Sequence, residues 1–155
     1  MSVTEQTLKK ELLRAKEQAN PQLILDLIPY SSFIGAQARQ DDNQVLYWLD
    51  RRPSNIGNPS LPAIHGGVIG GFLELSAAIE ILYTLDVNLV PKVVDFSLDY
   101  LRPGRYKTIY ANCTVLRQGK KLVNVTATAW QDDPQTPIAN AVSYTHLTLP
   151  TILRV

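Results

Sequence analysis

The residues best suited to chemistry in this sequence are the acid Glu74 and the glycines before it. Glu74 lies eight residues after Gly66, in a long apolar run that follows His65-Gly66-Gly67. If this run is a helix, the N–H of Gly66 has no intrahelical acceptor and suits a developing oxyanion. An acid buried in an apolar helix becomes more basic, which suits Glu74 to act as a general base or a nucleophile. The pair meets the two needs of hydrolysis at a carbonyl.

The spacing of these two groups limits how they act together. Eight residues of an ideal helix rise about 12 Å, which is too far for Gly66 and Glu74 of one chain to reach the same carbonyl. A second acid, Glu80, lies six residues after Glu74 and points well over a right angle away from it. We expect Glu80 to face solvent or to form a salt bridge.

The histidines and the glycine cluster indicate no metal or cofactor. We expect His65 to hydrogen-bond the loop before the helix rather than to act as a base. His65 and His146 are far apart in the sequence and lack acids at ligand spacing, so no metal site is expected. The glycines are not followed by the Gly-Lys-Ser or Gly-Lys-Thr of a phosphate-binding loop.

The composition indicates one hydrophobic core and no strong overall electrostatic field. The chain has 155 residues, of which 45% are hydrophobic, with 15 basic and 14 acidic side chains. This charge balance predicts neither nucleic acid nor an anionic membrane as a partner. The single cysteine, Cys113, cannot form an intramolecular disulfide, and we expect a buried structural thiol. Because the N-terminus lacks an apolar signal segment, we expect a cytoplasmic protein.

Apolar periodicity and turn residues predict one domain over 1–155 that begins with a helical extension over 1–30. The elements expected after it are a hairpin of strands 33–40 and 44–50, a loop over 51–63, a buried helix over 66–85, and strands over 92–101, 106–117, 122–130 and 138–147. This order predicts an α+β fold in which an antiparallel sheet wraps around one long central helix. The helix is apolar on nearly all sides, and the apolar surface left over predicts a dimer.

Three motifs carry a resemblance to a known family. They are His65-Gly66-Gly67 with an acid nine residues after the histidine, a strand that ends in Tyr100-Leu101-Arg102-Pro103, and the hairpin Arg117-Gln118-Gly119-Lys120-Lys121. In this order and spacing they resemble the hotdog-fold acyl-CoA thioesterase superfamily, in particular its phenylacetate-pathway branch. The resemblance covers roughly 33–142.

The resemblance implies an enzyme that hydrolyses acyl-CoA to a free acid and CoA. It implies Glu74 as base or nucleophile and the Gly66 amide as oxyanion donor, contributed by different subunits of a homodimer or of a homotetramer built as a dimer of dimers. His65, Gly67 and Asn58 are the implied supporting residues. The sequence departs from the family in three places: the family branch more often has aspartate at position 74, Asn58-Pro59 is one residue further from the histidine, and 143–155 is an atypical tail.

Several interpretations remain open from the sequence. The basic residues Arg117, Lys120 and Lys121 have two possible roles. They form a solvated turn, or they hold the phosphates of coenzyme A. A non-catalytic hotdog protein that binds acyl-CoA or a fatty acyl ligand is an alternative function. A hydratase or dehydratase centred on His65 is another. The acyl group itself is not defined by these residues.

Overall fold

The computed structural model describes residues 5–87 and 91–147, and its main feature is an antiparallel sheet around one long helix. The helices are α1 (Glu5–Glu17), α2 (Gln22–Leu25), α3 (Pro29–Ile34), the 3-10 helix η1 (Pro53–Asn55) and α4 (Gly66–Thr84). The strands are β1 (Ala36–Asp41), β2 (Gln44–Leu49), β3 (Ile56–Asn58), β4 (Ala63–Ile64), β5 (Lys92–Tyr100), β6 (Ile109–Gln118), β7 (Leu122–Trp130) and β8 (Ala139–His146).

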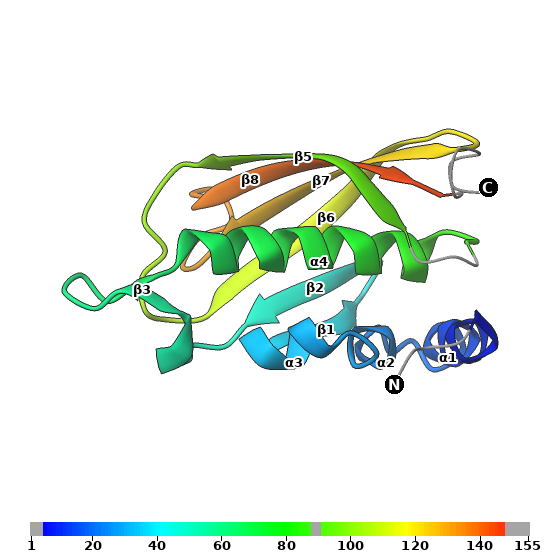
Figure 1. Ribbon diagram of the computed structural model, residues 1–155, viewed down its shortest axis with the longest axis horizontal. Coiled ribbons are helices and arrows are strands. Elements are labelled where there is room, and N and C mark those ends of the chain that lie inside the picture. The colour runs from blue at the N-terminus through cyan, green and yellow to red at the C-terminus, as the bar shows by residue number, and fades with distance from the viewer. Residues whose placement is uncertain (1–4, 88–90, 148–155) are drawn as a thin grey trace, which may run out of the picture.

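The large sheet curves over α4 (Figure 1). It has six strands in the order β1-β2-β6-β7-β8-β5, and every neighbouring pair is antiparallel. Strands β6, β7 and β8 contact α4. Along β7 every second residue is buried, namely Val123, Val125, Ala127 and Ala129, because successive side chains of a strand point to opposite faces. The predicted α+β architecture is confirmed.

The long helix α4 begins where the sequence predicts. His65 caps it, and its side chain accepts a hydrogen bond from the N–H of Gly67. The helix has the length and apolar composition of a membrane-spanning segment, but most of it is buried inside the fold, as in a core helix. Its fully buried side chains include Phe72, Leu73 and Ile79. Burial on most sides explains why the sequence shows almost no polar face.

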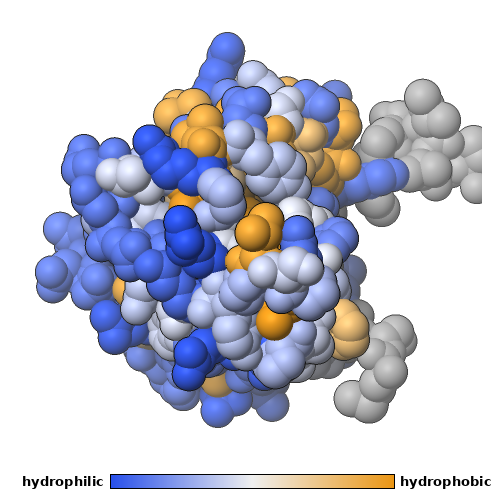
Figure 2. Space-filling model, turned by 90° about the vertical axis from the view of Figure 1, so that its left-hand side faces the viewer, coloured by the Kyte–Doolittle hydropathy of each residue, from blue (hydrophilic) through white to orange (hydrophobic). Residues whose placement is uncertain are grey.

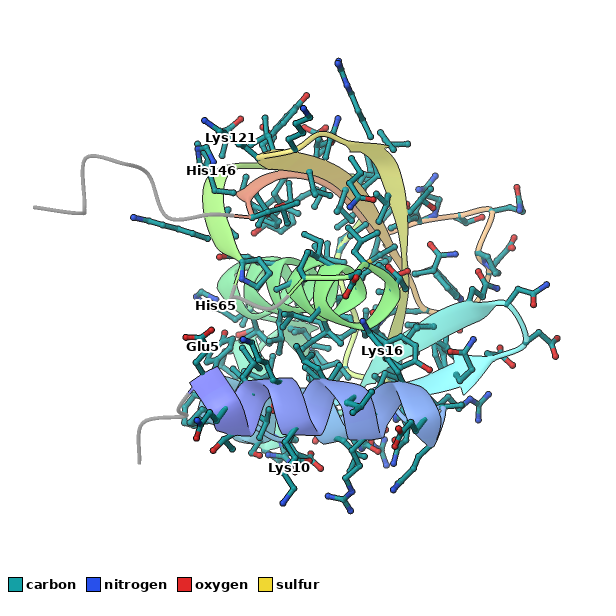
Figure 3. All side chains as sticks on the ribbon, turned by 90° about the vertical axis from the view of Figure 1, so that its right-hand side faces the viewer. Glu5, Lys10, Lys16, His65, Lys121 and His146 are labelled. Atoms are coloured by element: carbon teal, nitrogen blue, oxygen red, sulfur yellow. The ribbon has the colours of Figure 1, made fainter. Side chains whose placement is uncertain are left out.

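The N-terminal extension packs on α4, on the side away from the curved sheet (Figure 3). The sequence predicts a surface helix with a thin apolar stripe at 4–20, yet Leu8, Leu12 and Ala15 of α1 are buried. Pro29 occupies the first position of the third helix, α3. This position tolerates proline because its missing N–H would have no helical acceptor.

The loop predicted over 51–63 is more ordered than expected. It contains η1, and β3 pairs with β4 in a small two-stranded sheet. Other predicted boundaries are close: β7 is predicted to the residue, and the first hairpin turns at Asp42, whose φ of 51° is left-handed. The predicted last strand is present as β8, including residues 143–146 of the atypical tail, whereas 148–155 lie outside the described residues.

Candidate active site

The start of α4 leaves the N–H of Gly66 open. The N–H of Gly67 donates to Nδ1 of His65 at 2.9 Å, and the N–H groups of Val68 and Ile69 donate to the His65 carbonyl at 3.0 and 3.2 Å. Within the described residues the Gly66 N–H has no acceptor. It lies at the positive end of the helix dipole, so an anionic oxygen placed there would be stabilised.

Tyr100, the last residue of β5, holds Gly66 from the sheet. Its hydroxyl donates a 2.7 Å hydrogen bond to the carbonyl oxygen of Gly66. A Cβ at position 66 would lie 3.1 Å from that hydroxyl oxygen, so a glycine leaves the space that this contact needs. The tyrosine of the Tyr-Leu-Arg-Pro motif therefore supports the Gly66 half of the site, a role that its place in the sequence does not indicate.

Asn55 fixes the loop before α4. It is buried, its carbonyl accepts from the N–H of His65 at 2.8 Å, and its side-chain amide donates to the carbonyl of Ile34 at 2.8 Å. The side chain of Asn58, predicted to support the site, accepts a hydrogen bond from the N–H of Ser60 at 3.0 Å. The loop residue bonded to the helix cap is therefore Asn55. Asn55 is the last residue of η1, and the sequence marks it only as one of the two asparagines in the predicted loop over 51–63.

Glu74 lies in an open groove on α4. The side chain is exposed in the single chain, so the expectation of a buried carboxylate is not met. The groove has a volume of about 570 Å³ and is lined by Tyr30, Gly71, Glu74, Leu75, Ala78, Pro91, Lys92 and Val93.

The reason for this exposure is a stripe of small residues on α4. Gly67, Gly71 and Ala78 are exposed or half-buried, and they share with Glu74 the spacing of one helix face. The rest of α4 is covered by the sheet and by α1–α3. The part of α4 that the chain leaves open is therefore the part that carries the acid.

Glu80 is the buried acid of α4, contrary to the prediction that it faces solvent or forms a salt bridge. Its carboxylate accepts a 2.6 Å hydrogen bond from the hydroxyl of Tyr47 on β2. Burial raises the pKa of Glu80, and the hydrogen bond from Tyr47 partly opposes this. Burial also raises the pKa of the Cys113 thiol, with the Glu80 charge as a second cause. Cys113 is half-buried and packs against the core, so the thiol is less buried than the sequence predicts.

The two halves of the site lie along β5. Tyr100 at its end contacts Gly66, while Lys92 and Val93 at its start line the groove of Glu74. Gly66 and Glu74 are eight residues apart on α4, which corresponds to about 12 Å of helix rise. The geometry therefore agrees with the prediction that one chain does not bring both groups to one carbonyl.

The three predicted CoA-binding residues are exposed near the tip of the β6–β7 hairpin. Lys121 lies on the sheet, across α4 from Lys10 and Lys16 of α1 (Figure 3). Its neighbour Leu122 pairs with His146, which pairs with Lys92 of the Glu74 groove. Because His146 lies between Leu122 and Lys92, two strand spacings, about 10 Å, separate those two residues. Arg117, Lys120 and Lys121 thus belong to the same end of the sheet as the groove.

A second basic group lies near the start of α4. The carbonyl of Gly104 accepts from the N–H of Ile64, and Arg105 pairs with Ala63. Arg102 donates to the carbonyl of Pro137 at 2.6 Å. Figure 2 shows this end of the molecule as mostly hydrophilic with small hydrophobic patches.

No group of three His, Cys, Asp or Glu able to hold a metal occurs among the described residues.

The fold, a long helix under a curved antiparallel sheet, and the family comparison together identify a thioester hydrolase. The chain belongs to the thioesterase superfamily, whose family model matches residues 61–138. That range contains Gly66, Glu74 and the predicted CoA-binding residues. The resemblance stated from the sequence is therefore confirmed.

Individual proteins show the same relationship. The medium/long-chain acyl-CoA thioesterase YigI of Escherichia coli (strain K12) is 25% identical over 130 residues, which cover 75% of this chain and 83% of YigI. A crystal structure of a protein from Chromobacterium violaceum is 36% identical, with a TM-score of 0.74, covering 90% of this chain and 97% of that one. The E. coli PaaI protein from the phenylacetic acid degradation operon, 17% identical with a TM-score of 0.68 over 91% of this chain and 98% of that one, shows the fold alone.

Proposed function

We propose that this chain hydrolyses acyl-CoA at a site formed between two copies, with Gly66 from one chain and Glu74 from the other. The observation that carries the proposal is the pairing of an open Gly66 amide with an exposed Glu74 on the uncovered face of the same helix. Membership of the thioesterase superfamily and the similarity to an acyl-CoA thioesterase support the substrate class.

The surface of α4 supports the proposed dimer. Gly67, at the start of α4, is exposed and has no side chain, which lets a second helix approach this end of α4 closely. If two such helices pack antiparallel about a twofold axis, the start of each lies beside the middle of the other. Gly66 of one chain then lies near Glu74 of the second, which removes the separation imposed within one helix.

Hydrolysis at this site needs few steps. The thioester carbonyl oxygen accepts a hydrogen bond from the Gly66 N–H, which stabilises the negative charge that develops on it. As a general base, Glu74 takes a proton from water while the water oxygen bonds to the carbonyl carbon. The C–S bond then breaks, and the proton passes to the CoA sulfur. As a nucleophile, the Glu74 carboxylate would bond to the carbonyl carbon and expel CoA as a thiolate, giving an acyl anhydride. Water then opens the anhydride to the free acid and the Glu74 carboxylate, and the proton released passes to the CoA thiolate.

Coenzyme A would be held at the rim by basic side chains. Arg117, Lys120 and Lys121 are exposed, and Leu122, the neighbour of Lys121, lies two strand spacings, about 10 Å, from Lys92 of the groove. In the described residues none of them forms a salt bridge with an acid of the chain. They are therefore available to the phosphates of the substrate.

His65 is a poor candidate for the base of a hydratase. Its Nδ1 accepts the N–H of Gly67 at 2.9 Å. In the neutral ring the proton must then be on Nε2, so neither nitrogen is a free acceptor. This contact favours the role predicted from the sequence, a histidine that supports the loop and the helix start.

Release of free thiol from a panel of acyl-CoAs tests the proposal. Wild type is compared with Glu74→Gln and Glu74→Ala, and both variants are expected to lose about 10²- to 10⁴-fold in kcat. Equal turnover in all three proteins would refute the role of Glu74. Saturable acyl-CoA binding by calorimetry without any hydrolysis would instead indicate the non-catalytic binding protein.

A further inference from the structure

The groove of Glu74 has one wall that comes from the N-terminal extension. Tyr30 of α3 lines it together with Gly71 and Glu74 of α4, and Val93 of β5 lies in the same lining. Tyr30 is 41% exposed and Phe33 is 73% exposed. Their rings stack with centroids 6.3 Å apart. The extension thus presents two aromatic rings at the edge of the groove that contains the acid.

The fit between Tyr30 and Gly71 is close. A Cβ built at Gly71 would lie 2.5 Å from the hydroxyl oxygen of Tyr30 and 3.0 Å from its ring. Any other residue at position 71 would therefore push the tyrosine out of its position. Gly71 lies three residues before Glu74 on the same face of α4, so the ring lies within one helical turn of the acid.

The short helix that carries the two rings is firmly anchored. Ser31 is buried, and its hydroxyl lies 2.7 Å from the carbonyl oxygens of both Leu25 and Ile28. Asn55 donates to the carbonyl of Ile34 at the end of the helix and also binds His65 through its backbone. The helix is thereby joined to the loop that forms the start of α4, and the position of Tyr30 is coupled to the candidate active site.

We propose that Tyr30, stacked on Phe33, is a substrate-binding residue that contacts the acyl chain of the thioester as it runs from Glu74 along α4. The groove suits a hydrocarbon because the apolar side chains of Leu75, Ala78 and Val93 line it together with Tyr30. This inference rests on the proposed function, since it takes Glu74 as the position of the reacting carbonyl. A short acyl group would end before it contacts the ring, whereas a medium or long chain would cover it.

The test compares kcat/KM for decanoyl-CoA and acetyl-CoA in wild type and Tyr30→Ala. Loss of an aromatic contact removes apolar area from the long substrate only, so the decanoyl-to-acetyl ratio should fall about tenfold. Gly71→Ala, which displaces the ring while keeping it in the protein, should lower the ratio in the same direction. Tyr110→Ala is the matched control, because Tyr110 stacks on Trp130 on the face of the sheet away from α4, and its ratio should stay within twofold of wild type.

An unchanged or increased ratio in Tyr30→Ala, with hydrolysis retained, overturns the inference and leaves the proposed function standing. Calorimetry tests the inference in the case where the wild type hydrolyses no acyl-CoA. Decanoyl-CoA and free CoA are titrated into Glu74→Gln with and without Tyr30→Ala. Weaker binding of decanoyl-CoA alone in the double variant supports the acyl groove even if the wild type hydrolyses no acyl-CoA, and equal binding in the two proteins overturns it.

Discussion

The hydroxyl of Tyr100 donates a 2.7 Å hydrogen bond to the carbonyl oxygen of Gly66. The contact joins the end of β5 to the first residue of α4 across 34 positions of sequence, and it orients the glycine whose N–H we propose as the oxyanion donor. Tyr100→Phe keeps the ring and removes the bond. A net hydrogen bond is worth about 0.5–1.5 kcal/mol, so we expect kcat to fall by up to about tenfold.

The readouts for Tyr100→Phe are kcat, KM and the unfolding temperature. The bond is exposed, so the unfolding temperature should change little while kcat falls. A variant with wild-type kcat would show that the tyrosine does not position Gly66.

The variants Gly66→Pro and Gly66→Ala distinguish the effect of losing the N–H of residue 66 from the effect of adding a side chain there. Proline at the first helical position keeps the helix and removes the donor, whereas alanine keeps the donor and adds only a Cβ. Both side chains crowd the Tyr100 hydroxyl, since a Cβ would lie 3.1 Å from it. We therefore expect the proline variant to lose about 10²- to 10³-fold more in kcat than the alanine variant. Equal losses in steady-state hydrolysis would exclude the amide as oxyanion donor.

A mixture of Gly66→Pro and Glu74→Gln tests whether the site lies between two chains. Each variant alone is expected to be nearly inactive. In a mixed dimer one of the two sites has both native groups, so random mixing at equal amounts should restore about a quarter of wild-type activity. The subunits are unfolded and refolded together before thiol release is measured. No recovery, with mixed dimers demonstrated by differently tagged subunits, would argue against a site shared by two chains.

Glu80→Gln should remove a pH dependence of stability. Burial raises the pKa of Glu80 from its ordinary value of 4.5, so the folded protein binds this proton more tightly than the unfolded chain. Its contribution is therefore most favourable below about pH 4.5 and is lost as the pH rises through the folded pKa. In thermal unfolding between about pH 4 and 8, Glu80→Gln should lose this decline and therefore be more stable relative to wild type at the upper end of the range than at the lower end.

The control for this change is Glu17→Gln, an exposed acid of α1. It is expected to follow the wild-type curve. Parallel curves for wild type and Glu80→Gln would mean that Glu80 does not cause the pH dependence.

If Lys120 and Lys121 bind the phosphates of CoA, their loss should affect acyl-CoA but not a thioester that lacks the nucleotide. Lys120→Ala with Lys121→Ala should raise KM for acyl-CoA about tenfold at low salt and leave hydrolysis of a short thioester without the nucleotide unchanged, because the lysines would contact only the phosphates. Lys10→Ala on α1, on the other side of α4 (Figure 3), is the matched control. An equal effect on both substrates would point to a structural role for the hairpin.

Much of this protein is determined locally by its sequence. The apolar run from Gly66 and the glycine-rich start predict α4, and the turn residues at Gly119 and Lys120 predict the boundary of β7, because helix caps and turns depend on residues close in sequence. The motif spacing also predicts the superfamily, which the match over residues 61–138 confirms.

The tertiary structure decided what surrounds each acid of α4. Both acids lie on one apolar helix, and their spacing predicts only that they point in different directions. The side that meets the sheet depends on partners far along the chain: Tyr47, 33 residues away, binds Glu80 in the interior, while Tyr30 closes one side of the groove in which Glu74 stays exposed. Such contacts come from the packing of whole elements, and no local pattern encodes them.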